Sequence, residues 1–211
     1  MKELLIITGP QGSGNHLFSK VFATSPEVFG WQSLLSTVWQ GHHEEPFAEY
    51  WQTPSTLSNF NWDHKDYYIA NISCPYFYNS VPNIPKYREF IGEAAKYVDV
   101  IKFAIIGRDQ NILELQQTRL RGGPTSYIAQ KEFEYIFDNF DCVFLSQELL
   151  YLYKQRYVKY IARQLDWPLD HTDPRLDAIL SEDTNAKYVE QAAGKLDEYI
   201  ISASKNSFRT R

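Results

Sequence analysis

Short runs of consecutive apolar residues recur along the chain, and each is bounded by residues that favour turns or loops. Four of these runs lie at residues 3–8, 67–73, 99–106 and 141–145. They are too short for typical helices and are apolar on both faces, which is the pattern of strands buried within a sheet. We therefore predict four buried strands.

Between these runs the apolar residues repeat every three or four positions, as in amphipathic helices. Buried strands that alternate with helices form parallel sheets covered on both faces. We therefore predict a three-layer α/β fold with a mainly parallel sheet, in which residues 1–211 form a single domain. The helical segments lie at about 17–22, 90–98, 112–119 and 149–165, with a last helix at about 185–201 capped by Asp183 or Thr184.

The segment at about residues 30–65 departs from this alternation. Its apolar periodicity is weak, and it carries Trp31, Trp39, Trp51 and Trp62. Long irregular segments inside compact domains are commonly binding loops or lids. We predict an aromatic-rich insertion on the substrate side of the domain. The alternative is that these aromatic side chains serve packing alone.

The charge balance and the two cysteines narrow the classes of function. With 21 Lys and Arg against 26 Asp and Glu, the net charge of −5 disfavours general electrostatic binding of nucleic acid. Two cysteines are too few for a disulfide framework or a cysteine-rich zinc site. The apolar run at residues 4–7 is too short for a signal peptide or a membrane span, so we expect a cytoplasmic protein whose partners are neither nucleic acid nor membrane.

A glycine-rich turn connects the first predicted strand to the first predicted helix. Glycines let backbone N–H groups converge on an anion, and the dipole of a helix N-terminus favours negative charge. We predict that Gly12, Ser13, Gly14, Asn15 and His16 bind an anionic group. The alternative is a tight strand-to-helix turn without a ligand.

The loop differs from that of nucleotide-hydrolysing P-loop proteins at two positions that serve metal-dependent chemistry. Gly9 and Gly14 have the spacing of G-x-x-x-x-G-K-[ST], but Asn15 replaces the lysine and His16 replaces the hydroxyl residue that binds Mg²⁺. None of the predicted strands ends in an aspartate that could be a second metal ligand. The pattern favours transfer of an anionic group without a metal and weakens the alternative, a nucleotide-kinase-type phosphotransferase.

At these residues the chain resembles the sulfotransferase family whose donor is 3′-phosphoadenosine 5′-phosphosulfate (PAPS). Residues 13–17 (SGNHL) are similar to the family's loop for the 5′-phosphosulfate, after its basic residue. Residues 105–110 (IIGRDQ) are similar to the strand-end element whose arginine holds the donor's 3′-phosphate. Looser similarities at 143–150 and 165–168 extend the resemblance over about residues 3–170.

The resemblance implies a P-loop NTPase-like fold, PAPS as the donor and no metal. It makes Arg108 the ligand of the donor's 3′-phosphate. Gln116 stands eight residues later, where the family commonly has a serine that also contacts this phosphate. The function we expect is transfer of a sulfuryl group from PAPS to a hydroxyl or amine of a carbohydrate or small metabolite.

Three positions bear on whether catalysis is retained. Gly12 stands where the family usually has Lys or Arg, and Ser73 ends the second predicted strand where the small-molecule branch has a basic His. Lys20 could replace the missing loop cation; the alternative is a solvated lysine. These losses leave a non-catalytic nucleotide-binding module as a further alternative to the transferase.

The base that deprotonates the acceptor is expected in residues 42–45. In another branch of the family a glutamate after the first helix has this role, and on that resemblance we predict His43 and Glu44 as catalytic residues. Asp63 and His64 are a second candidate pair. No metal site is expected at residues 42–45, because adjacent side chains diverge.

Two basic stretches leave alternatives open. Residues 119–123 (RLRGG) either cover the donor nucleotide or form the C-terminus of a helix, where Arg suits the dipole and Gly ends the helix. Residues 205–211 are interpreted as a solvated end.

Overall fold

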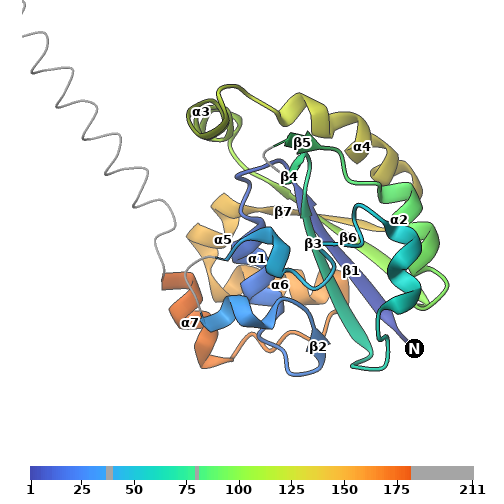
Figure 1. Ribbon diagram of the computed structural model, residues 1–211. Helices are drawn as coiled ribbons and strands as arrows, with labels where there is room; N and C mark the ends of the chain where they lie inside the picture. The colour runs from blue at the N-terminus through green and yellow to red at the C-terminus, as the bar shows by residue number, and fades with distance from the viewer. Residues whose placement is uncertain (37–39, 79–80, 182–211) are drawn as a thin grey trace, which may run out of the picture. The chain divides into compact units, whose positions relative to one another are not determined.

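The chain divides into two units, Met1–Ile179 and Leu180–Arg211. Trp39, the last predicted helix with its caps and the basic tail lie outside the described residues. The computed structural model describes residues 1–36, 40–78 and 81–181 (Figure 1).

Five strands of the first unit form a sheet in which every neighbouring pair is parallel. The four predicted strands are all present, and their bounds differ from the predicted ones by at most one residue at either end. The fifth strand, β2, was not predicted, since a two-residue strand leaves no periodic pattern. In spatial order the strands are β2 (Val28–Phe29), β3 (Tyr67–Ser73), β1 (Glu3–Gly9), β6 (Val100–Gly107) and β7 (Cys142–Ser146).

The order of the strands places the loop after β1 where a ligand is expected. β2 and β3 lie on one side of β1, and β6 and β7 lie on the other. In open parallel sheets, ligands bind outside the carboxyl ends of the strands, at the point where the direction of winding reverses. A two-stranded antiparallel hairpin, β4 (Tyr76–Tyr78) and β5 (Val81–Asn83), follows β3 at the same end (Figure 1).

Helices α2 (Tyr87–Ala94) and α4 (Ser126–Asn139) cover one face of the sheet (Figure 1). Alternate residues of β1, Leu4 and Ile6, join buried residues of both helices in one hydrophobic cluster. The prediction from apolar spacing found α2 but missed α4, whose buried face in the described residues includes only Ala129 and Ile136.

Helices α1 (Asn15–Phe22) and α6 (Gln155–Leu165) cover the opposite face. Hydrogen bonds from strand residues fix both helices there. Asn71 of β3 donates to the carbonyl of Asn15 at the start of α1 (3.0 Å), and Lys102 of β6 donates to the carbonyl of Leu165 at the end of α6 (2.9 Å). These contacts complete the three layers that the sequence predicts.

The remaining helices connect these layers. The segment predicted as one helix at 149–165 is two helices, because Lys154 between them has a φ of 46°, outside the helical region. In the described part of the chain, no helix is both long enough and apolar enough to cross a membrane. The connecting helices are α3 (Gln110–Arg121), α5 (Gln147–Tyr153) and α7 (Pro174–Ser181).

The aromatic-rich segment contributes mainly to the core on the α2 side. Phe47, Trp51 and Trp62 are buried, and the ring of Trp51 stacks on that of Phe90 with centroids 3.8 Å apart. Of the two interpretations of these aromatic residues, packing therefore accounts for the buried ones. The segment has three 3₁₀ turns, η1 (Gln32–Ser36), η2 (His42–Glu44) and η3 (Pro54–Asn59).

Candidate functional site

The loop between β1 and α1 has a conformation that requires glycine at three positions. Gly12 has a φ of 87° and Gly14 a φ of 110°, both in the left-handed region that side chains disfavour. A Cβ atom on Gly9 would lie 2.6 Å from the carbonyl oxygen of Ile106, so no larger residue fits there. The glycines thus serve the geometry of the loop itself.

The start of α1 presents backbone N–H groups at this loop. The helix's first backbone hydrogen bond runs from the N–H of Phe18 to the carbonyl of Gly14 (3.1 Å). The N–H groups of Asn15, His16 and Leu17 therefore precede the helix's own hydrogen-bond ladder. Together with the helix dipole, such groups suit an anion.

The side chains of the loop stabilise its shape. Ser13 is fully buried, and its hydroxyl donates to the amide oxygen of Asn15 (3.0 Å). The amide nitrogen of Asn15 donates to the carbonyl of Ile72 (3.2 Å) and to the hydroxyl of Ser73 (3.1 Å) at the end of β3. At the position where nucleotide-hydrolysing proteins have lysine, this chain therefore has a residue that ties the loop to the neighbouring strand.

Arg108 reaches the loop from the end of β6. Its guanidinium donates to the carbonyl of Gly12 (2.9 Å) and to the amide oxygen of Gln116 (3.1 Å). The structure thus brings together the loop glycine that replaces the usual cation, an arginine from another strand and the residue eight positions later. These three residues, together with Ser13 to His16, are the predicted ligands of the donor.

Gln116 and Gln117 are both buried but have different contacts. The amide nitrogen of Gln116 has no hydrogen-bond partner among the described residues. Gln117 uses both ends of its amide: it donates to the carbonyl of Gln11 (2.8 Å) and accepts from the N–H groups of Thr125 (2.6 Å) and Ser126 (3.1 Å). A buried donor without a partner costs about 1–3 kcal/mol, so the amide of Gln116 fits an anionic oxygen beside Gly12.

Lys20 is 6% exposed, so the interpretation as a solvated lysine is wrong. It lies in the last turn of α1, where a positive charge interacts favourably with the helix dipole. The spacing of apolar residues in the helix could not predict that Lys20 is buried, because lysine is a polar residue.

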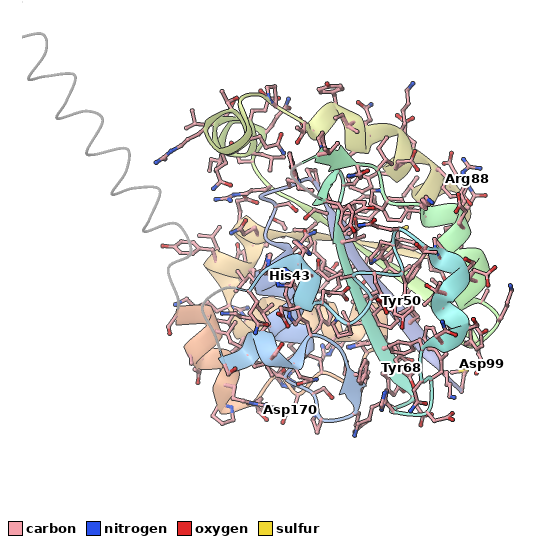
Figure 2. The ribbon with its side chains drawn as sticks, viewed as in Figure 1. His43, Tyr50, Tyr68, Arg88, Asp99 and Asp170 are labelled. Atoms are coloured by element: carbon pink, nitrogen blue, oxygen red, sulfur yellow. The ribbon has the colours of Figure 1, made fainter. Side chains whose placement is uncertain are left out.

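The segment at residues 42–45 carries two kinds of titratable side chain. His43 and Glu44 are exposed, and Nε2 of His43 lies 3.3 Å from Oε1 of Glu44. Figure 2 labels His43. Glu45 is buried, and its carboxylate accepts from the N–H groups of Asn71 (3.0 Å) and Phe47 (2.9 Å). Burial raises the pKa of Glu45 to about 8, against the opposing effect of these two hydrogen bonds.

Glu45 links this segment to the anion loop. It accepts from the backbone of Asn71, and the side chain of Asn71 donates to the carbonyl of Asn15 (3.0 Å) and to the hydroxyl of Ser19 on α1. Glu45 is not among the residues predicted to be catalytic. Nothing in the HHEE run distinguishes the glutamate that turns inward, because that depends on β3 being alongside.

Ring contacts place η2 beside the start of α1. The ring of His16 lies 4.9 Å from that of His42 and 5.0 Å from that of Trp31, centroid to centroid. The Nε2 atom of His16 is 3.2 Å from the carbonyl oxygen of Gln40. His16 therefore joins the anion loop to the segment that carries His43.

A cavity of about 590 Å³ lies next to these contacts. Its lining includes His42 and His43 from η2, Ile72 from the end of β3 and Tyr76 from β4. The carbonyl of Ile72 accepts from Asn15, so the cavity begins beside the anion loop. Glu44 is not part of the lining, but its Oε1 atom lies 3.3 Å from Nε2 of His43, which is.

Asp63 and His64 do not lie near the anion loop. Asp63 forms an ion pair with Lys2 (2.9 Å), and the ring of His64 stacks on Phe29 with centroids 4.6 Å apart. Both precede the first residue of β3, at the amino ends of the strands, whereas the loop is at the carboxyl ends. Asp63 and His64 therefore lie at the edge of the sheet opposite the anion loop, too far away to act as the base there.

The basic stretch after β6 is a helix end. Helix α3 continues to Arg121, and Gly122 caps it with a φ of 79°. This confirms the interpretation of residues 119–123 as a C-terminus. At the start of the same helix, the side chain of Asp109 accepts from the N–H of Ile112 (3.0 Å), which fixes the turn that carries Arg108.

Cys74 lies beside the loop, where its N–H donates to the carbonyl of Gly9 (3.0 Å). Cys74 follows β3 and is buried, and burial raises the pKa of its thiol to about 12, so little of it is thiolate at neutral pH. Among residues 1–36, 40–78 and 81–181, no group of three or more His, Cys, Asp or Glu side chains is arranged to hold a metal ion.

Comparisons with known proteins find likeness in structure. No protein-family model and no curated protein sequence matches the chain. The sulfotransferase domain of the Synechococcus PCC 7002 olefin synthase superposes with a TM-score of 0.51 at 14% identity, over 87% of this chain and 82% of that one. A sugar kinase from Janibacter sp. HTCC2649 has a TM-score of 0.45 at 11% identity, over 79% of this chain and 96% of that one. The likeness to the first of these two structures shows a shared α/β fold with a mainly parallel sheet.

Proposed function

We propose that this protein is a transferase that moves a sulfuryl group from PAPS to a hydroxyl or amine of a carbohydrate or small metabolite. The observation that carries the proposal is the contact of Arg108 with the carbonyl of Gly12 and with Gln116. It gives the glycine loop a cation that its own sequence lacks. The fold shared with the sulfotransferase domain supports the same conclusion.

The residues at the loop fit the anionic groups of such a donor. The N–H groups at the start of α1 would bind the 5′-phosphosulfate, while Arg108 and the amide of Gln116 would bind the 3′-phosphate. The loop has neither the lysine nor the hydroxyl residue of metal-dependent phosphate transfer. When bound, PAPS supplies an activated sulfuryl group.

His43 and Glu44 are the proposed base for the acceptor. His43 lines the cavity beside the loop, and Glu44 is within 3.3 Å of its Nε2 atom. A carboxylate that orients an imidazole and stabilises its protonated form makes the imidazole a better base, as in other His–carboxylate pairs.

Binding of adenosine 3′,5′-bisphosphate tests the donor site. It should bind equally well with and without EDTA, and Arg108→Ala should weaken it by about 10- to 150-fold, because charge-assisted hydrogen bonds are worth about 1.5–3 kcal/mol. AMP should bind almost equally to both proteins. Arg88→Ala is the matched control, since Arg88 lies on α2 over the ring of Tyr135.

Three results would contradict the proposed donor site. A requirement for Mg²⁺ with preference for ATP would favour the nucleotide-kinase alternative. Equal loss of AMP and bisphosphate in Arg108→Ala would show that Arg108 stabilises the fold. Failure of the wild-type protein to bind bisphosphate would remove PAPS as the donor.

Turnover tests the proposed base. Once an acceptor is found, Ala or Gln at His43 or Glu44 should leave donor binding intact and lower turnover at least about a hundredfold in one of the two, in the range of a positioned base. Wild-type rates in both variants would exclude this pair. Donor binding without turnover on any acceptor would favour the non-catalytic module.

A further inference from the structure

The cavity beside the anion loop has two chemically different walls. One wall is polar and comes from η2 and the turn that follows it, including His43, Glu49, Gln52 and Thr53. The other is apolar and comes from the ends of β3 and β4, including Ile72 and the residues Tyr76–Tyr78. The hairpin side chains remain accessible, with Phe77 39% and Tyr78 51% exposed.

This arrangement matches the two sides of a sugar ring. A pyranose has a flat face of C–H groups that packs on an aromatic ring and an edge of hydroxyls that needs donors and acceptors. The volume of about 590 Å³ lies within the usual range of pockets that bind small ligands. Among the described tryptophans of the aromatic-rich segment, Trp31, Trp51 and Trp62 are buried and so do not provide the flat surface.

The charge of the lining limits which sugars fit. Among the described lining residues, Glu49 is the acid, the basic side chains are His42 and His43, and neither lysine nor arginine is present. Glu49 is exposed and lines the cavity, and its carboxylate also forms a hydrogen bond with the side chain of Tyr50. A carboxylate opposes a second negative charge nearby and attracts an ammonium group.

We propose that this cavity binds a neutral or amino sugar and discriminates against acidic sugars, with Glu49 as the residue that sets this preference. The inference rests on the proposed function, because it treats the cavity as the acceptor site of the transferase. It narrows the acceptor from any carbohydrate or small metabolite to sugars without a carboxylate or sulfate at the bound ring.

Three sugars that differ mainly in charge test the preference. Glucosamine, glucose and glucuronate would be titrated by ligand-observed NMR against the full chain, with and without adenosine 3′,5′-bisphosphate. We expect glucosamine to bind at least as well as glucose, and glucuronate to bind about tenfold more weakly than glucose, as expected for one unfavourable charge contact near the surface.

Substitutions at Glu49 sharpen the test. Glu49→Gln should bring the affinities for glucosamine and glucose together, and Glu49→Lys should favour glucuronate over glucosamine. Glu134→Gln is the matched control: this glutamate is exposed on α4, where it accepts from Gln130 (3.2 Å), and the order of the three sugars should not change. Thermal unfolding of each variant checks that it is folded.

The outcomes separate this inference from the proposed function. If the bisphosphate binds but glucuronate binds as well as glucose, or no sugar binds, the inference is wrong and the donor site stands. If the sugars follow the expected order but the bisphosphate does not bind, the cavity is a sugar site and the sulfotransferase proposal is wrong. An order that does not respond to Glu49→Lys excludes Glu49 as the determinant.

Discussion

Two buried regions of this protein differ in the chemistry of their side chains: one is aromatic and the other is polar. On the α2 side of the sheet, aromatic rings pack on one another: Trp51 stacks on Phe90, and Trp62 lies parallel to Tyr97 with centroids 5.7 Å apart. Around the anion loop, the buried side chains are mainly polar: amides such as that of Asn15, hydroxyls and one carboxylate. Both regions exclude water, but different forces hold them together.

The difference shows how each region responds to change. Hydrophobic packing is non-directional, so the aromatic region depends on volume and contact area. Buried polar groups need correctly placed partners, so the loop region depends on geometry. The polar region holds Asn71, Asn15 and Glu45 in one connected set, which makes the position of the loop depend on β3. Three sets of substitutions test this difference.

The largest expected effect is in the aromatic region. Trp51→Ala should lower the free energy of unfolding by about 3–5 kcal/mol, because it leaves a large cavity at a fully buried position. Urea unfolding measures the change. Trp51→Phe, which keeps a ring against Phe90, should lose clearly less. A loss below about 1 kcal/mol for Trp51→Ala would show that the region repacks and is not a tight core.

The second effect is a pH dependence that originates in Glu45. Its pKa of about 8 in the folded protein lies above the ordinary value of 4.5, so the unfolded chain releases this proton first as pH rises. The contribution to stability is therefore complete at low pH and lost as pH rises through the folded-state pKa. Between about pH 5 and pH 8 the loss should be about 3 kcal/mol, since one unit of pKa difference corresponds to about 1.4 kcal/mol.

Two glutamine variants isolate this contribution. Glu45→Gln should be less stable than the wild type at low pH, because it cannot accept from both Asn71 and Phe47, but its stability should fall less with rising pH. Glu44→Gln, at the exposed neighbour, should keep the wild-type slope. Unfolding in urea at several pH values measures the stability at low pH and its slope with pH for each variant. An unchanged slope in Glu45→Gln would mean that the buried carboxyl titrates at its ordinary pKa.

The smallest effects come from two adjacent glutamines. Gln117→Ala should lower the free energy of unfolding by about 1–3 kcal/mol, because three backbone groups lose their partner. Gln116→Ala should change stability by less than about 1 kcal/mol and weaken adenosine 3′,5′-bisphosphate about tenfold, as the loss of one hydrogen bond to a charged group predicts. Titration calorimetry measures the affinity for the bisphosphate, and urea unfolding measures the stability of both variants. Equal behaviour of the two variants would contradict the division between a structural and a ligand-binding glutamine.

Local patterns were sufficient to predict the sheet and the loop. A buried parallel strand is a continuous apolar run, so the four long strands and the parallel sheet could be predicted without an alignment. The glycine loop could be predicted for the same reason: a strand, a left-handed turn at Gly12 and Gly14 and a helix start are neighbours in sequence. From the family's spacing of eight residues, Arg108 and Gln116 were predicted to contact the same phosphate, and helix α3 brings the two side chains within hydrogen-bond distance (3.1 Å).

What the sequence could not determine depends on partners far away along the chain. Glu45 turns inward because the N–H of Asn71, 26 residues later, is available on β3 beyond the residues that pair with β2. Its neighbours Glu44 and His43 stay outside. Residue type alone made Asp63 and His64 a second candidate pair for the base, and only the direction of β3 places them at the opposite edge of the sheet. In each case the side chain itself is unremarkable, and its role follows from which strand end or carbonyl lies next to it. Residue type and spacing therefore determined the fold and the loop, while packing between distant segments decided which polar side chains are buried and which face the cavity.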